Sequence, residues 1–253
     1  MASSLLPHLW LLVSLAALLV LQRQMLSHLQ RLLLLLTNSP KASFLIYAAL
    51  FLPGVALHEI GHWLLARLLG VRIHGFSLRP VRRRDGSYRL GYVETAETDP
   101  LRAALIGAAP LAAGGAALAL IGFRFLGLDE LGRELLAGAW AEAAGQVRQM
   151  GTIPALGLWL YLALCVSNTM LPSAADRAAW LSVALALLFL AGLVAVLGLG
   201  SQALVWVRPG AEAFSRALAS ILTLSAALDL LAVPPLWLAE RLAARLTGRD
   251  VVG

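Results

Sequence analysis

Long apolar runs constrain the fold of this 253-residue chain more than any other feature of its sequence. Several approach the length of about 20 residues that an α-helix needs to cross the hydrocarbon core of a bilayer. Strands of a membrane barrel would instead be segments of about 10 residues with alternating polarity. Charged residues make up only 13% of the chain, whereas soluble domains carry about 25%. The sequence therefore predicts an all-α, multi-pass integral membrane protein in contact with a lipid bilayer.

Six apolar stretches are expected to cross the membrane as helices, with a short β-hairpin after the second. They are residues 5–21, 43–69, 101–123, 153–172, 181–199 and 211–231. Residues 25–37 have leucines at helical spacing with polar residues between them, so they either extend the first span or lie on the membrane surface. Residues 125–150 mix charged with apolar residues, which predicts a surface helix. A short tail helix is expected after Pro234-Pro235.

The same pattern divides the chain into three parts. Residues 1–42 hold the N-terminal transmembrane helix and the interfacial segment, residues 43–180 a membrane core with a hairpin at 71–99, and residues 181–253 the C-terminal transmembrane helices and a basic tail. Polarity alternates on both sides of Asp85-Gly86, which is typical of a β-hairpin. Such a strand pair either offers a free edge to an extended peptide or is a solvated connection.

The second span contains the pattern H-E-x-x-H, formed by His58, Glu59 and His62. An ionisable side chain in hydrocarbon costs roughly 2.5–3.5 kcal/mol, so three together must face protein, water or a metal. His58 and His62 stand one helical turn apart on one face, where both can reach an ion about 2 Å away, and Glu59 beside them is a candidate general base. Alternatively, the two histidines make ordinary interhelical hydrogen bonds.

Pro53-Gly54, one turn earlier, is either a kink that admits water or a packing position.

A third metal ligand is expected because catalytic zinc typically takes three protein ligands and a water. Cys165 is the only cysteine, which excludes a multi-cysteine site. We expect Asp176, which follows the fourth span, to be this ligand; the alternative is that it pairs with Arg177. Asp229, in the sixth span, is an intramembrane carboxylate without an assigned role.

Charge distribution orients the chain. The net charge is +6, but the arginines flank apolar spans, so no nucleic-acid partner is expected. The loop between the second and third spans is rich in arginine, which places it in the cytoplasm by the positive-inside rule. His58, His62 and Asp176 then meet at one depth near the cytoplasmic face. Three basic residues do not fit this topology, because it places them on the outer side of the membrane: Arg23, Arg31 and Lys41.

These residues resemble the site-2 protease family of intramembrane zinc metalloproteases. The resemblance lies in A-L-H-E-I-G-H-W-L-L-A-R-L-L-G at 56–70 and N-T-M-L-P-S-A-A-D at 168–176, and it covers about residues 50–180. It implies one Zn²⁺ per chain bound by His58, His62 and Asp176, with Glu59 as catalytic base and Asn168 holding the substrate backbone or the oxyanion. The second motif departs from the family's Asn-x-x-Pro and Asp-Gly pattern.

The resemblance implies hydrolysis of a peptide bond in or near a transmembrane segment of another membrane protein. It also implies a minimal member without a PDZ or CBS domain. The charge distribution places the expected active site toward the cytoplasm, and the expected location is the plasma (inner) membrane. A non-catalytic accessory subunit that keeps the protease fold is the alternative, although retention of Glu59 argues against it. A metal transporter would need further intramembrane ligands forming a path. The sequence indicates no oligomeric state.

Overall fold

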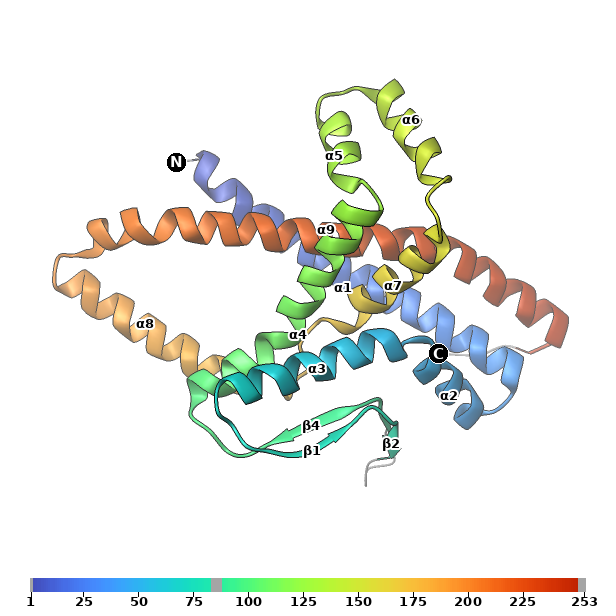
Figure 1. The fold of residues 1–253 in the computed structure, drawn as a ribbon, viewed down its shortest axis with the longest axis horizontal. Helices are drawn as coiled ribbons and strands as arrows, with labels where there is room; N and C mark the ends of the chain where they lie inside the picture. The colour runs from blue at the N-terminus through green and yellow to red at the C-terminus, as the bar shows by residue number, and fades with distance from the viewer. Residues whose placement is uncertain (1, 83–87, 250–253) are drawn as a thin grey trace.

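Helices dominate the computed structural model, which describes residues 2–82 and 88–249 (Figure 1). Three helical segments are long and apolar enough to cross a membrane, and a bent pair of shorter helices could form a fourth span. The three are the α1 helix (Ala2–Thr37), α4 (Pro100–Leu120) with the π-helical turn η1 (Ile121–Phe125), and α9 (Gly200–Thr247). The bent pair is α2 (Pro40–Leu50) and α3 (Leu52–Leu68), which meet at 66°.

The expected count of six spans is not confirmed. The fourth and fifth expected spans correspond to α7 (Leu156–Thr169) and α8 (Trp180–Val196), which are apolar but only 14 and 17 residues long. A helix rises about 1.5 Å per residue, so neither matches the roughly 30 Å of a bilayer core without help from flanking residues. By length and composition, three or four spans are present among the described residues.

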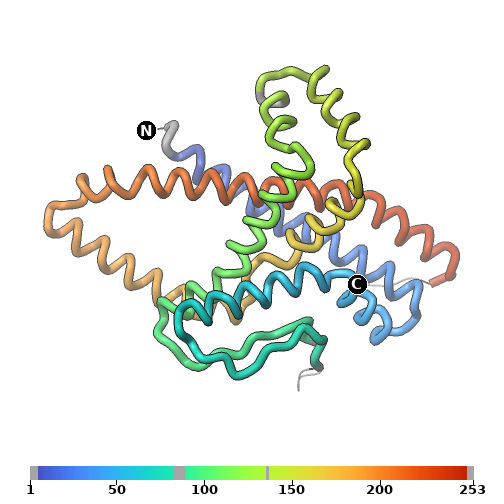
Figure 2. The backbone as a smooth tube through the Cα atoms, viewed as in Figure 1, coloured from blue at the N-terminus to red at the C-terminus, as the bar shows by residue number. Residues whose placement is uncertain are grey.

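α1 and α9 lie side by side along the longest dimension of the molecule (Figure 2). α1 is one continuous helix, so residues 25–37 extend the first span. α9 also continues through Pro234 and Pro235, so the expectation of a separate tail helix is wrong. Polar side chains pair across this interface: His28 Nδ1 lies 2.5 Å from Glu240 Oε2. Such pairs offset the free-energy cost of burying polar side chains within an apolar helix. Both helices can therefore continue past these residues.

The bend between α2 and α3 occurs at Phe51, just before Pro53. Gly54 is buried against α7, where a Cβ would overlap the Cys165 carbonyl oxygen and the Thr169 hydroxyl. The bend and the packing position expected at Pro53-Gly54 are therefore both present. The chain bends beside the proline, and the glycine lets α3 approach α7 closely.

A small antiparallel sheet connects α3 with α4, in agreement with the predicted hairpin. In this sheet β1 (Ile73–Ser77) pairs with β4 (Tyr92–Thr95). The short strands β2 (Val81–Arg82) and β3 (Tyr88–Arg89) form a second, separate two-stranded sheet. Ser77 faces Tyr92, and the register shifts between Ile73 and Gly75. The predicted turn at Asp85-Gly86 lies outside the described residues. In Figure 1 this sheet runs alongside α3.

α4 crosses the middle of the molecule and contacts α3, α7 and α9. Its N-terminus is capped by Asp99, whose Oδ1 accepts a hydrogen bond from the Arg102 backbone N–H at 3.0 Å. That hydrogen bond lowers the pKa of the Asp99 carboxyl. Buried side chains from α1, α4, α7 and α9 form the main apolar core; among them are Leu18, Leu118, Val166, Met170 and Leu222.

The segment after α4 is a pair of helices and not the one surface helix expected for residues 125–150. α5 (Leu128–Leu136) and α6 (Trp140–Met150) project from the core as a helical hairpin (Figure 1). Gly138, between them, has φ +71°, a backbone conformation that glycine adopts without the steric penalty of a side chain. The helix therefore stops there and the chain reverses.

Candidate metal centre

α3 presents His58 and His62 on one face, and each ring is held by a backbone carbonyl. His58 Nδ1 lies 2.6 Å from the Thr169 carbonyl oxygen of α7, and His62 Nδ1 lies 2.8 Å from the Ile106 carbonyl oxygen of α4. Because a carbonyl oxygen only accepts, both Nδ1 atoms carry the proton of the neutral ring. Both Nε2 atoms therefore present lone pairs, and they lie 3.2 Å apart.

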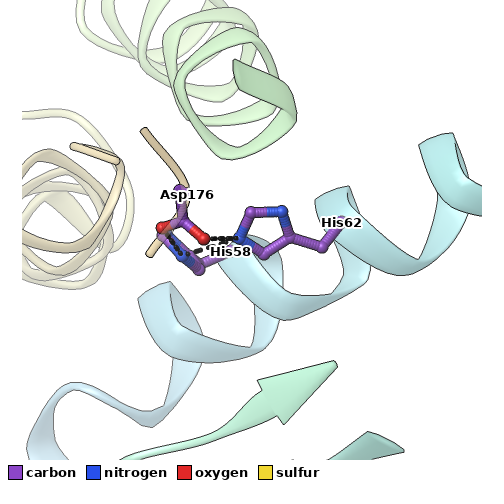
Figure 3. Close-up of side chains that lie close together, drawn as sticks. All are labelled: His58, His62 and Asp176. Carbon is purple, nitrogen blue, oxygen red and sulfur yellow. Dashed lines mark hydrogen bonds and ion pairs between the residues drawn. The ribbon is translucent and has the colours of Figure 1, made fainter. Parts of the chain in front are cut away.

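Asp176 brings a carboxylate to the same point (Figure 3). Asp176 Oδ1 lies 3.2 Å from His62 Nε2, and Oδ2 lies 3.7 Å from His58 Nε2. Arg177, the alternative partner of Asp176 in the sequence, donates from Nε to the Ser173 carbonyl oxygen at 3.3 Å. The three predicted ligands are thus brought together although they come from two distant parts of the chain.

Contacts within the segment between α7 and α8, and between that segment and α4, position Asp176. The Ser173 backbone N–H donates to Asp176 Oδ2 at 2.7 Å. The Asp176 carbonyl oxygen rests directly over Gly107 of α4, where a Cβ would overlap it. Farther along, the Trp180 indole N–H donates to the Ala104 carbonyl oxygen at 3.3 Å. α4 therefore positions this segment by side-chain and backbone contacts.

The cluster fits a metal ion. Lone pairs of two imidazoles and a carboxylate converge without a hydrogen between the two Nε2 atoms, an arrangement that is repulsive until a cation enters. Ligand atoms bound at 2.0–2.1 Å around a tetrahedral ion stand about 3.3 Å apart, close to the observed separations of 3.2, 3.2 and 3.7 Å. The hydrogen bonds at Nδ1 are those that orient metal-binding histidines. His58, His62 and Asp176 could therefore hold a metal ion.

Glu59 lies beside this triad, and one of its carboxylate oxygens has no hydrogen-bond partner among the described residues. Its side chain is only 6% exposed, and its buried Oε2 atom makes no hydrogen bond with the described residues. Gly91, just before β4, leaves space for it: a Cβ there would lie 2.9 Å from Glu59 Cγ. A buried carboxylate oxygen without a donor is costly, so this atom is available to a ligand or a water.

Two clefts meet at the metal triad. One, of about 340 Å³, is lined by residues that include Glu59, Asn168 and Tyr47. The other, of about 310 Å³, runs between α4 and β4. His62, Arg89, Ala175 and Asp176 line both. His62 and Asp176 thus stand in a wall shared by both clefts, whereas His58 lines only the cleft that contains Glu59.

The structure also assigns a partner to Asp229. Asp229 is fully buried, and its Oδ1 accepts a hydrogen bond from Asn168 Nδ2 at 2.7 Å. Asn168 is 9% exposed and lines the cleft that contains Glu59. Tyr47 and Arg89 line the same cleft and are not indicated by the sequence motifs. Asp229 could have been suspected because an ionisable residue inside an apolar helix needs a partner.

No family model, curated protein or solved structure matches this chain. Its function is therefore inferred from the site itself.

Proposed function

We propose that this protein is an intramembrane zinc metalloprotease that hydrolyses a peptide bond in or near a transmembrane segment of another membrane protein. One observation carries the proposal: the lone pairs of His58, His62 and Asp176 converge beside the unpartnered carboxylate oxygen of Glu59 in an open cleft. Three protein ligands for the metal and a neighbouring carboxylate as general base are the groups that a zinc hydrolase needs.

His58, His62 and Asp176 would hold one zinc ion per chain. Two imidazoles and one carboxylate are a typical ligand set for catalytic zinc, which supports zinc over harder ions that prefer oxygen ligands. When bound, zinc supplies a water of lowered pKa and polarises a carbonyl oxygen. The Thr169 and Ile106 carbonyls keep the two imidazoles in the tautomer that binds metal.

Glu59 would act as the general base. Its Oε2 atom is buried, has no hydrogen-bond partner among residues 2–82 and 88–249, and belongs to a residue that lines the cleft with the triad, so it can accept a proton from an attacking water and return that proton to the leaving amine. Neither proton transfer requires Glu59 to bind the metal. The backbone gap at Gly91 leaves room for the Glu59 side chain.

The substrate would lie along β4 in an extended conformation. β4 pairs with β1 on one edge, and residues of and beside β4 line the two clefts; these are Arg89, Leu90, Gly91, Val93 and Thr95. An extended peptide can add to such an edge through main-chain hydrogen bonds. A helical substrate segment must first unwind, because its peptide groups are otherwise satisfied within the helix.

The membrane location belongs to the same proposal. Three or four membrane-capable helices support an integral membrane protein, and the arginine-rich segment between α3 and α4 supports a cytoplasmic position for that segment. We place the protein in the plasma (inner) membrane, with the active site toward the cytoplasm.

The test is Glu59→Gln, a nearly isosteric change that removes the base and leaves all three ligands. We expect zinc content and thermal unfolding to match the wild type, while hydrolysis falls at least 10²–10⁴-fold, the usual contribution of general-base catalysis. Wild type and variant are co-expressed with a panel of single-span membrane proteins, and fragments are identified by mass spectrometry.

Two results would overturn this proposal. Identical fragments from both proteins, with zinc bound in each, would favour an accessory subunit that keeps the fold without turnover. Loss of zinc from Glu59→Gln would instead show that Glu59 is a ligand or a structural residue, and its assignment as base would be wrong.

A further inference from the structure

The buried pair formed by Asn168 and Asp229 connects the cleft with α9. Asn168 belongs to the last turn of α7 and lines the cleft beside Glu59, whereas Asp229 lies inside α9 with no exposed surface. Gln22 of α1 donates from Nε2 to the Asn168 backbone carbonyl at 3.0 Å, so a second helix also holds this residue. A fully buried carboxyl without a structural ion pair needs a reason to be there.

The side-chain amide of Asn168 donates both of its N–H groups to acceptors that do not line the cleft. Nδ2 lies 2.7 Å from Asp229 Oδ1, 3.0 Å from the Leu164 carbonyl oxygen and 3.3 Å from Ser167 Oγ. An amide nitrogen carries only two hydrogens, so none remains for another acceptor. The other amide atom, Oδ1, is buried and has no partner among the described residues.

Two acceptors fix this orientation of the amide. A reversed Asn168 would place its oxygen against the Leu164 carbonyl, which can only accept, and against the Asp229 carboxyl. The Leu164 carbonyl lies in the same helix as Asn168, so this hydrogen bond alone would be lost whenever the Asn168 side chain rotated to another conformation. Asp229 adds a second, more strongly accepting group from a separate helix.

We propose that Asp229 is a positioning residue that holds the Nδ2 side of the Asn168 amide, so that the unpartnered Oδ1 is the amide atom left to accept a backbone N–H of a bound substrate. This inference rests on the proposed protease function. It assigns Asn168 to the substrate backbone and removes it from the oxyanion, because an oxyanion requires a donor and both Asn168 donors are used.

The experiment measures kcat and KM on a single-span membrane protein whose cleavage depends on Glu59. Asp229→Leu removes the acceptor and keeps a buried side chain of similar size. Because the Asn168 acceptor would serve bound substrate and transition state alike, we expect KM to rise roughly 3- to 10-fold with kcat nearly unchanged. Zinc content should equal that of the wild type. Asp229→Asn, whose amide oxygen still accepts from Nδ2, should restore KM.

Ser225→Ala is the matched control. Ser225 is also fully buried on α9, one turn before Asp229, and among the described residues its hydroxyl donates to the Ile221 carbonyl of the same helix. We expect no change in KM. In an Asn168→Ala background, Asp229→Leu should have no further effect on KM, since the two residues act as one unit.

Several outcomes would overturn the inference. An Asp229→Asn variant as impaired as Asp229→Leu would show that the carboxylate acts by its charge or proton. If Asn168→Ala slows turnover roughly 10²- to 10³-fold at constant KM, Asn168 is a donor at the oxyanion, and this variant remains decisive if Asp229→Leu does not fold. If cleavage depends on Glu59 but not on Asp229, only this inference fails; if nothing depends on Glu59, the proposed function fails with it.

Discussion

Replacing Gly107 with alanine should weaken the metal centre although Gly107 binds no metal. A Cβ at this position would overlap the Asp176 carbonyl oxygen, which approaches α4 at this point. The α4 helix is anchored along its length by α3, α7 and α9, whereas the segment that carries Asp176 is irregular. We expect the segment to yield and to move Asp176 away from His58 and His62.

The size of the effect follows from the overlap. Asp176 must withdraw by more than about 1 Å before the contact reaches van der Waals distance, and this is about half the length of a zinc–oxygen bond. Forcing an extra methyl group into a packed contact costs about 1–3 kcal/mol. If displacement of Asp176 absorbs this cost, zinc binding weakens roughly 5- to 150-fold.

Zinc affinity is measured by competition with a chelator of known affinity on detergent-purified protein. Gly115→Ala is the control, because it makes the same change on the same helix and its Cβ meets a flexible side-chain methyl of Ile221 at 3.0 Å. Both variants gain the same helix propensity, so any difference between them reports on the Asp176 contact. Wild-type zinc affinity in Gly107→Ala would refute the view that Gly107 positions the third ligand.

Two further predictions concern the ligands and the orientation. His58→Ala, His62→Ala and Asp176→Ala should each lower zinc content well below one per chain by metal analysis, because two protein ligands remain; full retention in Asp176→Ala would reassign the third ligand. In a Cys165→Ala background, a cysteine at the exposed Arg79 should react with an impermeant reagent only from the cytoplasmic side. Reaction from outside would invert the orientation.

The clustering of His58, His62 and Asp176, which could hold a metal ion, could be predicted because part of its geometry is local and because a metal site needs a third ligand. His58 and His62 share a helix, where a separation of four residues alone places both on one face. Asp176 could be predicted because a third ligand is required and few carboxylates are available. The hydrogen bond between Asn168 and Asp229 could not be predicted, since the face that α9 turns toward α7 depends on how several helices pack together.

Helix ends were harder to predict than helices. Polar residues such as His28 left open whether residues 25–37 extend the first span or lie on the membrane surface; in the structure Glu240 of α9 pairs with His28 and the helix continues. Pro234 and Pro235 predicted a break in the helix, because helix propensity describes a chain without tertiary contacts. Packing against α1 overrides that preference here.

His62 and Asp176 stand in a wall shared by two clefts, and under the proposed protease function this has a consequence for the products. A polypeptide bound past Asp176 would extend into both clefts, one on each side of the scissile bond. An enzyme that recognises a chain terminus instead has a cleft that is closed at one end. The cut would therefore fall in the interior of the chain. One fragment would be left in the cleft beside Tyr47 and the other in the cleft between α4 and β4, so the two could depart independently through separate mouths.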